Sequence, residues 1–139
     1  HPRDKDAYDI SYRSVRGPGE EWFLAATFRF REDAKASTAD IKALLARRKA
    51  SQPIGLPSCG SVFRNPPGDH AARLIESAGL KGRRIGGAEV SEKHANFIIN
   101  AGGASALDIE RLIDFVRDTV EQVHGIRLQP EVRVIGEAE

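Results

Sequence analysis

The chain has 139 residues, of which 40% are hydrophobic and 29% charged, a composition that fits one ordinary globular domain. Its formal net charge of +1 gives no reason to expect binding to nucleic acid or to a membrane surface, and no apolar run is long enough to span a bilayer. The single cysteine, Cys59, excludes a disulfide within the chain and fits a reducing cytoplasm. Because the chain begins at His1 without a methionine, we expect it to be part of a longer polypeptide.

The first third of the chain predicts a hairpin followed by a helix. Residues 8–13 place apolar side chains at alternate positions, and the run 22–31 is rich in β-forming residues. We expect these two segments to pair across the turn signal at 17–19. A helix begins near residues 37–38, which are good N-cap residues, and ends at Pro53.

The remaining sequence predicts two helices and several short extended segments. Helical periodicity returns at 69–78, with Asp69 as the N-cap, and again at 105–125 with a long apolar stripe. The stripe is formed by Ile109, Leu112, Ile113, Val116, Val120 and Val123. Extended segments are expected at 61–63, 97–99 and 126–135. We expect a loop at 57–60 and irregular structure in the glycine-rich stretch 82–87.

These elements indicate the fold class. Hairpins and helices are mixed without regular alternation of strand and helix, which favours an α+β domain over a doubly wound sheet. We predict a small antiparallel or mixed sheet packed against about three helices, as one compact domain that follows the first hairpin.

The segment 57–68 is dense in glycine, proline and small residues, and it contains the first candidate for chemistry. Gly60 permits another group to approach the backbone closely, and Ser61 follows it on a turn-to-strand corner. A serine so placed can donate a proton if its surroundings raise its acidity; the alternative is a corner where small residues only permit packing. Cys59 has no recognisable His and Asn or Asp partners, so we interpret it as a packed thiol.

Two further segments combine charge with glycine or histidine. The stretch 80–88 clusters Lys81, Arg83 and Arg84 among glycines, which suits either a diphosphate or a solvated basic turn. It is not a Walker P-loop, and the chain has few aromatic residues to support an RNA-binding interpretation of this turn. His94 stands at the entrance of an expected strand, where it either binds a ligand or satisfies a loop. The histidines do not fall at metal-ligand spacing, so we predict no metal site.

A carboxylate and an arginine complete the candidates. Glu131 follows Pro130, which has no N–H for strand pairing, so this acid begins the last expected strand. It is either a solvated edge charge or, in a closed site, a group that orients or polarises a reacting one. Arg13, between Tyr12 and Ser14, suits recognition of a carboxylate or phosphate.

Taken in order, these motifs resemble one family. The block from Pro57 to Asn100, the long helix after it and the closing LQPEVRVIG are similar to the C-terminal domain of the UDP-N-acetylenolpyruvoylglucosamine reductase family. Three elements carry the resemblance as a set: GS-x-F-x-NP, GL-x-G-x-x-IGG and PEVR-x-IG. The resemblance runs from about Tyr8 to the end of the chain.

The resemblance implies an activity. Enzymes of this family reduce UDP-N-acetylglucosamine enolpyruvate to UDP-N-acetylmuramate in peptidoglycan precursor synthesis in the bacterial cytoplasm. NADPH reduces bound FAD, and the reduced flavin passes hydride to the enolpyruvyl carbon distal to the ether. Enolate-like charge forms next to the substrate carboxylate, and a serine protonates the carbon that bears this carboxylate. We further expect a monomer that binds neither nucleic acid nor a membrane.

The resemblance also assigns roles to residues. Ser61 falls at the proton donor, Glu131 at the catalytic glutamate, and Arg13 at the arginine that binds and polarises the carboxylate. Asn65 matches a substrate-contacting asparagine in the same loop as Ser61. Further matches to substrate binding are Arg48, Gln52, His94 and Tyr12, and Gly60 is placed near the flavin.

The resemblance finally implies a division of the chain. Residues 1–31 correspond to the end of a FAD-binding domain, and residues 32–139 correspond to the substrate-binding C-terminal domain. Because most of that FAD-binding domain is not in this sequence, we expect the chain alone to bind FAD weakly or not at all and to be inactive. The alternatives are a stand-alone module that binds a UDP-sugar or nucleotide without redox activity, and a small basic RNA-binding domain.

Overall fold

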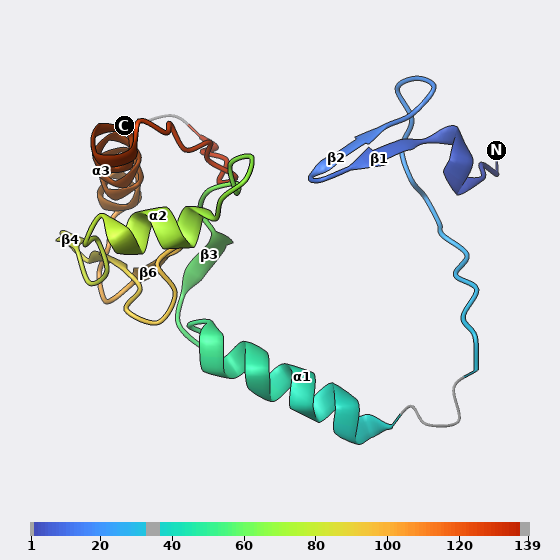
Figure 1. Cartoon of the computed structure of the whole chain (residues 1–139), viewed down its shortest axis with the longest axis horizontal. Helices are drawn as coiled ribbons and strands as arrows, with labels where there is room; N and C mark the ends of the chain where they lie inside the picture. The colour runs from blue at the N-terminus through green and yellow to red at the C-terminus, as the bar shows by residue number, and fades with distance from the viewer. Residues whose placement is uncertain (1, 33–36, 137–139) are drawn as a thin grey trace. The chain divides into compact units, whose positions relative to one another are not determined.

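The structure of the chain is a computed structural model that describes residues 2–32 and 37–136 (Figure 1). The chain divides into two compact units, His1–Ala36 and Ser37–Glu139. Across the described ranges, none of the helices combines the length and the apolar character needed to cross a membrane. A functional domain boundary between residues 31 and 32 stays a prediction from the sequence.

The first unit contains a short hairpin. After a 3-10 turn at Lys5–Ala7, strand β1 (Asp9–Ser11) pairs antiparallel with strand β2 (Ser14–Arg16). Ile10 and Val15 are partners in this register, and both side chains are exposed. A hairpin of neighbouring segments forms readily because its connection is short.

The expected pairing of residues 8–13 with residues 22–31 is wrong. The run 22–31 forms no strand, and its large side chains are exposed, with Trp22 at 91% and Leu24 at 96%. A preference for β structure mainly reflects packing on a half-buried pleated surface. Among the described residues no strand pairs with this run, so its composition alone does not make it a strand.

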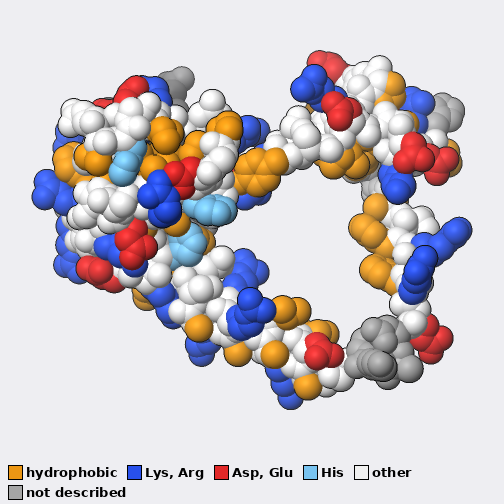
Figure 2. All heavy atoms as spheres, viewed as in Figure 1, with side chains coloured by type: hydrophobic (Ala, Val, Ile, Leu, Met, Phe, Trp, Pro, Cys, Tyr) orange, Lys and Arg blue, Asp and Glu red, His pale blue; other side chains and the backbone are white. Residues whose placement is uncertain are grey.

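The second unit begins with helix α1 (Thr38–Ser51), as the sequence predicts. Its first turn is closed by a capping box in which the backbone N–H of Ser37 donates to Oδ2 of Asp40 at 2.9 Å. No residue of α1 is buried. Figure 2 shows hydrophobic side chains along its exposed surface. Ile41 and Leu44 are two large apolar residues of this helix that are exposed.

A four-stranded antiparallel sheet forms the centre of the second unit. Its strands are β3 (Ser58–Ser61), β4 (Arg84–Ile85), β5 (Ala88–Val90) and β6 (Phe97–Asn100), in the spatial order β3-β6-β5-β4. The two long-range neighbours β3 and β6 are thus brought side by side, and β3 occupies one edge of the sheet.

The sequence predicts part of this sheet. The strand expected at 97–99 is confirmed by β6. The expected loop at 57–60 is instead mostly strand β3, and the hairpin of β4 and β5 begins inside the stretch that was expected to be irregular, 82–87. Strands of two to four residues carry too few positions for a recognisable alternation.

Helices α2 (Ala71–Ser77) and α3 (Ala106–His124) share one core with the sheet. Helix α3 contacts α2 and strands β4, β5 and β6. It begins at a capping box between Ser105 and Asp108 and ends at Gly125, whose φ of 67° is the left-handed conformation that closes many helices. The large side chains with less than 2% exposure are Val62, Phe63, Leu74, Ile75, Val90, Leu112, Val116, Val120 and Leu128.

The α+β prediction is confirmed, with three local corrections. Helix α2 begins at Ala71 rather than after Asp69, and Val123, expected in the apolar stripe of α3, is 56% exposed. The strand expected at 126–135 forms only an isolated antiparallel bridge between Phe63 and Pro130. Both bonds of this bridge come from flanking residues, so the N–H that Pro130 lacks is not used in it.

Candidate functional site

Ser61 is placed by a β-bulge. Ser58 pairs with Ile99 and Ser61 pairs with Phe97, so β3 carries one residue more than β6 between these two pairs. Gly60 lies inside the bulge with a φ of +83°, a left-handed conformation that residues with a side chain rarely adopt. The glycine therefore sets the local bend that leads into Ser61, which is half-buried.

Glu131 reaches the same part of the sheet through backbone pairing. Its N–H donates to the carbonyl of Val62 at 2.7 Å, and the N–H of Arg64 donates to the carbonyl of Gln129 at 2.9 Å. The Glu131 side chain is 17% exposed, and its Oε1 lies 3.9 Å from Nε of Arg64. Ser61 and Glu131 thus lie on adjacent, paired stretches of chain.

Asn96 is a residue of this site that the sequence analysis did not single out. It is 4% exposed, and both polar atoms of its side chain bond to the backbone of Phe63. Its carbonyl accepts a hydrogen bond from Val62 at 2.9 Å. The only signal in the sequence is an asparagine at the entrance of a buried strand, a position that favours side-chain bonds to the backbone.

Asn65 has a structural contact in addition to its predicted contact with substrate. Its Oδ1 accepts a hydrogen bond from the N–H of Ala71, the first residue of α2, at 3.0 Å. This bond satisfies one of the donors that a helix leaves unpaired at its start. The expected N-cap Asp69 instead pairs with Arg73, whose guanidinium holds the pKa of that carboxyl well below its usual range.

Two of the predicted substrate-binding residues, Arg48 and Gln52, lie at the end of α1. Nε of Arg48 donates to Oε1 of Gln52 at 3.0 Å, so these two side chains form one polar pair. Nζ of Lys93 donates to the carbonyl of Lys49 at 2.6 Å, which ties this end of α1 to the loop that carries His94.

His94 is held in a partly apolar setting. Its ring packs edge-on against Phe97 with centroids 4.9 Å apart, and its Nδ1 accepts a bond from the N–H of Asn96 at 3.3 Å. Desolvation by burial lowers the pKa of His94 below its ordinary value of 6.5. Through Nδ1 the ring serves as an acceptor within its own loop.

Tyr12 and Arg13 belong to the first unit, where they connect β1 to β2. Arg13 has a φ of 57°, and its guanidinium carbon lies 5.9 Å from the centre of the Tyr12 ring. A left-handed residue other than glycine costs roughly 1 kcal/mol, so this turn holds a conformation with some strain. Both side chains are exposed at the tip of the hairpin.

The basic turn at 81–84 does not form a phosphate cradle. Lys81 pairs with Glu76 at 2.7 Å, Arg84 pairs with Glu89, and the guanidinium of Arg83 lies 4.7 Å from the centre of the Phe115 ring. The space beside the neighbouring glycines is occupied by other atoms of the protein. A Cβ atom would meet Glu92 at Gly82, Asp108 at Gly86, and the backbone of Gly102 and Ala104 at Gly87.

These observations test whether the residues fit a flavin cofactor. At Gly60 a Cβ atom would meet no described atom within 4 Å, so the backbone there is open to the edge of a planar ring. The glycine turn that resembled a diphosphate cradle is close-packed. The described residues therefore leave open backbone at Gly60 and no open glycine cradle for a diphosphate at 82–87.

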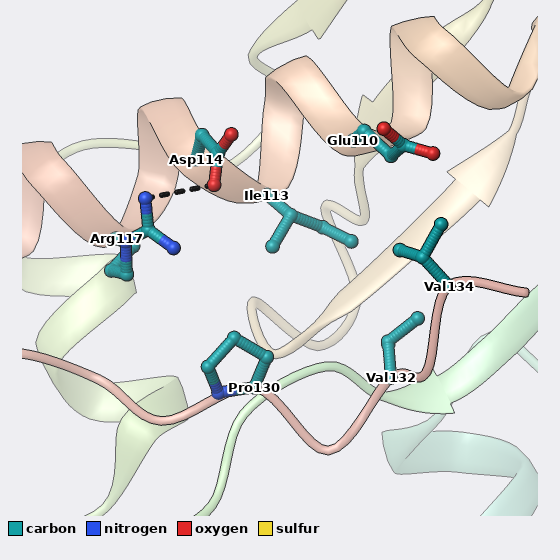
Figure 3. Close-up of a pocket in the computed structure, with 7 residues that line it drawn as sticks. All are labelled: Glu110, Ile113, Asp114, Arg117, Pro130, Val132 and Val134. Atoms are coloured by element: carbon teal, nitrogen blue, oxygen red, sulfur yellow. Dashed lines mark ion pairs between the residues drawn. The ribbon is translucent and has the colours of Figure 1, made fainter. Parts of the chain in front are cut away.

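A groove of about 210 Å³ lies between helix α3 and the segment that carries Glu131 (Figure 3). It is lined by Glu110, Ile113, Asp114, Arg117, Pro130, Val132 and Val134. Pro130 and Val132 line the groove, whereas Glu131 between them is not one of the lining residues. The charged side chains Asp114 and Arg117 of the groove form an ion pair with each other at 2.8 Å within α3.

Metal ligation and thiol reactivity depend on how the His, Cys, Asp and Glu side chains are placed. Among the described residues, no group of three or more His, Cys, Asp or Glu side chains is placed to hold a metal ion. Cys59 is exposed on β3, and partial desolvation raises the pKa of its thiol, which disfavours the reactive thiolate.

The comparisons first define a class: residues 52–135 match the family model described as "UDP-N-acetylenolpyruvoylglucosamine reductase, C-terminal domain". This range contains Ser61, Asn65, His94 and Glu131. The chain belongs to the UDP-N-acetylenolpyruvoylglucosamine reductase family.

Relatives of known name agree with this assignment. A UDP-N-acetylenolpyruvoylglucosamine reductase from Alkalilimnicola ehrlichii is 60% identical over 99% of this chain and 46% of its own length. One from Coxiella burnetii is 61% identical over 96% of the chain and 43% of its own length. The crystal structure of the reductase (MurB) from Thermus caldophilus matches with a TM-score of 0.57 and 35% identity, over 69% of this chain and 33% of that one. The chain thus spans about half the length of the curated relatives it matches.

Proposed function

We propose that the chain provides the substrate-reducing part of an enzyme that converts UDP-N-acetylglucosamine enolpyruvate to UDP-N-acetylmuramate. The observation that carries this proposal is the convergence of Ser61 and Glu131. The serine ends a bulged strand, and the acid lies on the segment whose N–H bonds to the residue after that serine. Family membership supplies the reaction for which such a donor and such a carboxylate are needed.

In this proposal the chain's own residues bind the substrate and handle the proton. Arg13 binds the enolpyruvyl carboxylate and polarises it, which favours the enolate-like charge that forms beside it. Ser61 donates a proton to the carbon that bears this carboxylate and regains one from solvent, to which it is partly open. Glu131 orients the reacting groups, while Asn65, Tyr12, Arg48, Gln52 and His94 contact the UDP-sugar.

The cofactors belong to the same proposal. FAD, when bound, supplies the hydride that adds to the distal enolpyruvyl carbon, and NADPH is the source of that hydride. We propose that FAD is held mainly by a domain of which residues 1–31 form the end, while residues 32–139 bind substrate. The open backbone at Gly60 and the close-packed glycines at 82–87 support this division. The enzyme works as a monomer in the bacterial cytoplasm.

Ligand preference tests this function. The complete enzyme, loaded with FAD, is titrated with UDP-N-acetylglucosamine enolpyruvate and, in parallel, with UDP-N-acetylglucosamine, which lacks the enolpyruvyl group. We expect tighter binding of the first ligand, amide NMR shifts at Ser61, Asn65 and Glu131, and reoxidation of prereduced enzyme by that ligand alone. Equal affinity for both ligands without reoxidation would indicate a binding module and contradict the proposal.

A further inference from the structure

Asn96 is a buried polar side chain beside Ser61 to which the proposed chemistry assigns no role. Its Oδ1 accepts a hydrogen bond from the N–H of Phe63 at 2.9 Å, and its Nδ2 donates to the carbonyl of Phe63 at 2.8 Å. One amide therefore makes both bonds with a single residue, as a paired strand does in an antiparallel sheet. Its own carbonyl adds a third bond, from the N–H of Val62 at 2.9 Å.

These bonds hold the two residues that directly follow Ser61. Ser61 itself pairs with Phe97, the residue after Asn96. The bulge at Gly60 interrupts the regular ladder just before the serine. Bulges bend a strand and leave one residue unpaired, so the pairing beyond the bulge decides where the next side chains lie.

The opposite edge of the same short segment is also bonded. The carbonyl of Val62 accepts from the N–H of Glu131 at 2.7 Å. Val62 and Phe63 are each about 1% exposed, and Asn96 is 4% exposed. The peptide between Ser61 and Phe63 is thus clamped from both sides, with Asn96 supplying one whole side.

We propose that Asn96 is a positioning residue that fixes the Ser61 hydroxyl for proton transfer. The inference rests on the proposed function, in which Ser61 is the donor. The neutral amide of Asn96 supplies in one side chain both the donor and the acceptor that bond to Phe63. A displacement of about 1 Å in a reacting group can cost about 100-fold in rate, so loosening this clamp slows the step without removing any group that touches the substrate.

The chain contains a matched control in the same strand. Asn100 ends β6, and its Oδ1 accepts from the N–H groups of Gly102 at 2.9 Å and Ala104 at 3.1 Å. Because both bonds at Asn100 use the acceptor, Asn100→Asp keeps them. Asn96→Asp has nearly the same shape and keeps the acceptor for Phe63, but it loses the donor once its carboxyl is ionised. Burial raises the pKa of such a carboxyl, so the two Asp variants are compared at a pH above that pKa. Asn96→Ala and Asn100→Ala form a second pair, in which each variant loses two side-chain bonds.

The test measures single turnovers of the complete, FAD-loaded enzyme. We expect Asn96→Asp to slow reoxidation of the reduced flavin by saturating substrate at least tenfold, with unchanged flavin reduction by NADPH and unchanged KM for substrate. Asn100→Asp should match the wild type. Independently of turnover, amide hydrogen exchange at Ser61 and Val62 should be faster in Asn96→Asp than in Asn100→Asp.

A double variant distinguishes positioning from a general structural effect. If Asn96 acts through Ser61, Ser61→Ala with Asn96→Asp should be no slower than Ser61→Ala alone. Three results would overturn the positioning role. The rate losses of the two single variants could multiply in the double variant. The two Asp variants could reoxidise at equal rates, or Asn96→Asp could change KM alone. If Ser61→Ala alone reoxidises at the wild-type rate, the donor assignment itself fails, and the positioning role fails with it. The alanine pair repeats the comparison should Asn96→Asp not accumulate as folded protein.

Discussion

The backbone N–H of Glu131 donates to the carbonyl of Val62 at 2.7 Å, which joins the last segment of the chain to the residue after Ser61. Two candidate groups that are far apart in the sequence are thereby tied through main-chain atoms. Because the bond does not involve the Glu131 side chain, that side chain can be exchanged while the pairing is kept. The structure therefore permits a clean separation of the chemistry of this acid from its place in the fold.

Glu131→Gln tests the role of the carboxylate. The amide has nearly the same shape, so we expect an unchanged fold and unchanged flavin reduction by NADPH. Reoxidation by the enolpyruvyl substrate should fall about 100-fold, the scale typical for loss of one positioned acid or base. Stopped-flow absorbance measures both steps. Glu110→Gln, in the groove of Figure 3, is the control. Equal losses in the two variants would contradict a specific role for Glu131.

Gly60→Ala tests the bulge that leads into Ser61. No described atom lies within 4 Å of a Cβ at this position, so the cost comes from the φ of +83° alone. We expect a loss of about 1 kcal/mol in the free energy of unfolding. Gly103→Ala meets the same condition, with a φ of +69° and open space, and should lose a similar amount. Only Gly60→Ala should also slow the substrate step. If the substrate step has the same rate in both variants, the bulge plays no part in the reaction.

Two substitutions of Asn65 separate helix capping from substrate contact. Asn65→Ala removes the acceptor for Ala71, so we expect a loss of about 1 kcal/mol in the free energy of unfolding, measured by urea denaturation. Asn65→Asp keeps that acceptor and should keep the stability. Both variants should bind the UDP-sugar more weakly, since both lack the amide donor. If Asn65→Asp binds the UDP-sugar as tightly as the wild type, the role of Asn65 is limited to capping α2.

Asp108 makes stability depend on acid pH. Hydrogen bonds from the backbone N–H and side chain of Ser105 hold the pKa of Asp108 below its ordinary value of 3.8. Its contribution is therefore complete above about 3.8 and is lost as the pH falls through the lower folded pKa. We expect the unfolding free energy of Asp108→Asn to fall less steeply below that pH than that of the wild type. Parallel curves would show that this cap does not contribute to the acid transition.

The parts of the fold that follow local rules are predictable from the sequence. The sequence predicts a helix over 105–125 with an apolar stripe, and α3 has its N-cap at Ser105 and its C-cap at Gly125. The run 22–31 shows the opposite case, because strand formation depends on a partner that the local sequence does not reveal. The brief strands β4 and β5 are too short for their alternation to be recognised.

The candidate site is likewise predictable from the sequence only in part. The order of the motifs around Ser61 and Glu131 identifies the family, and that resemblance is confirmed by the family model. The roles of these residues stay predictions. Neither the bonds of Asn96 nor the capping bond of Asn65 can be read from the sequence, because single bonds between a side chain and a backbone 33 or 6 residues away leave no periodic pattern.

Ser61→Ala tests the central claim most directly. In the complete, FAD-loaded enzyme, anaerobic stopped-flow absorbance follows flavin reduction by NADPH and then reoxidation by UDP-N-acetylglucosamine enolpyruvate. We predict wild-type flavin reduction and reoxidation slowed by about 100-fold or more, since one positioned proton donor contributes roughly that much. Ser58→Ala, in the same strand, should leave both steps unchanged. Reoxidation of Ser61→Ala at the wild-type rate would contradict the claim that this serine delivers the proton.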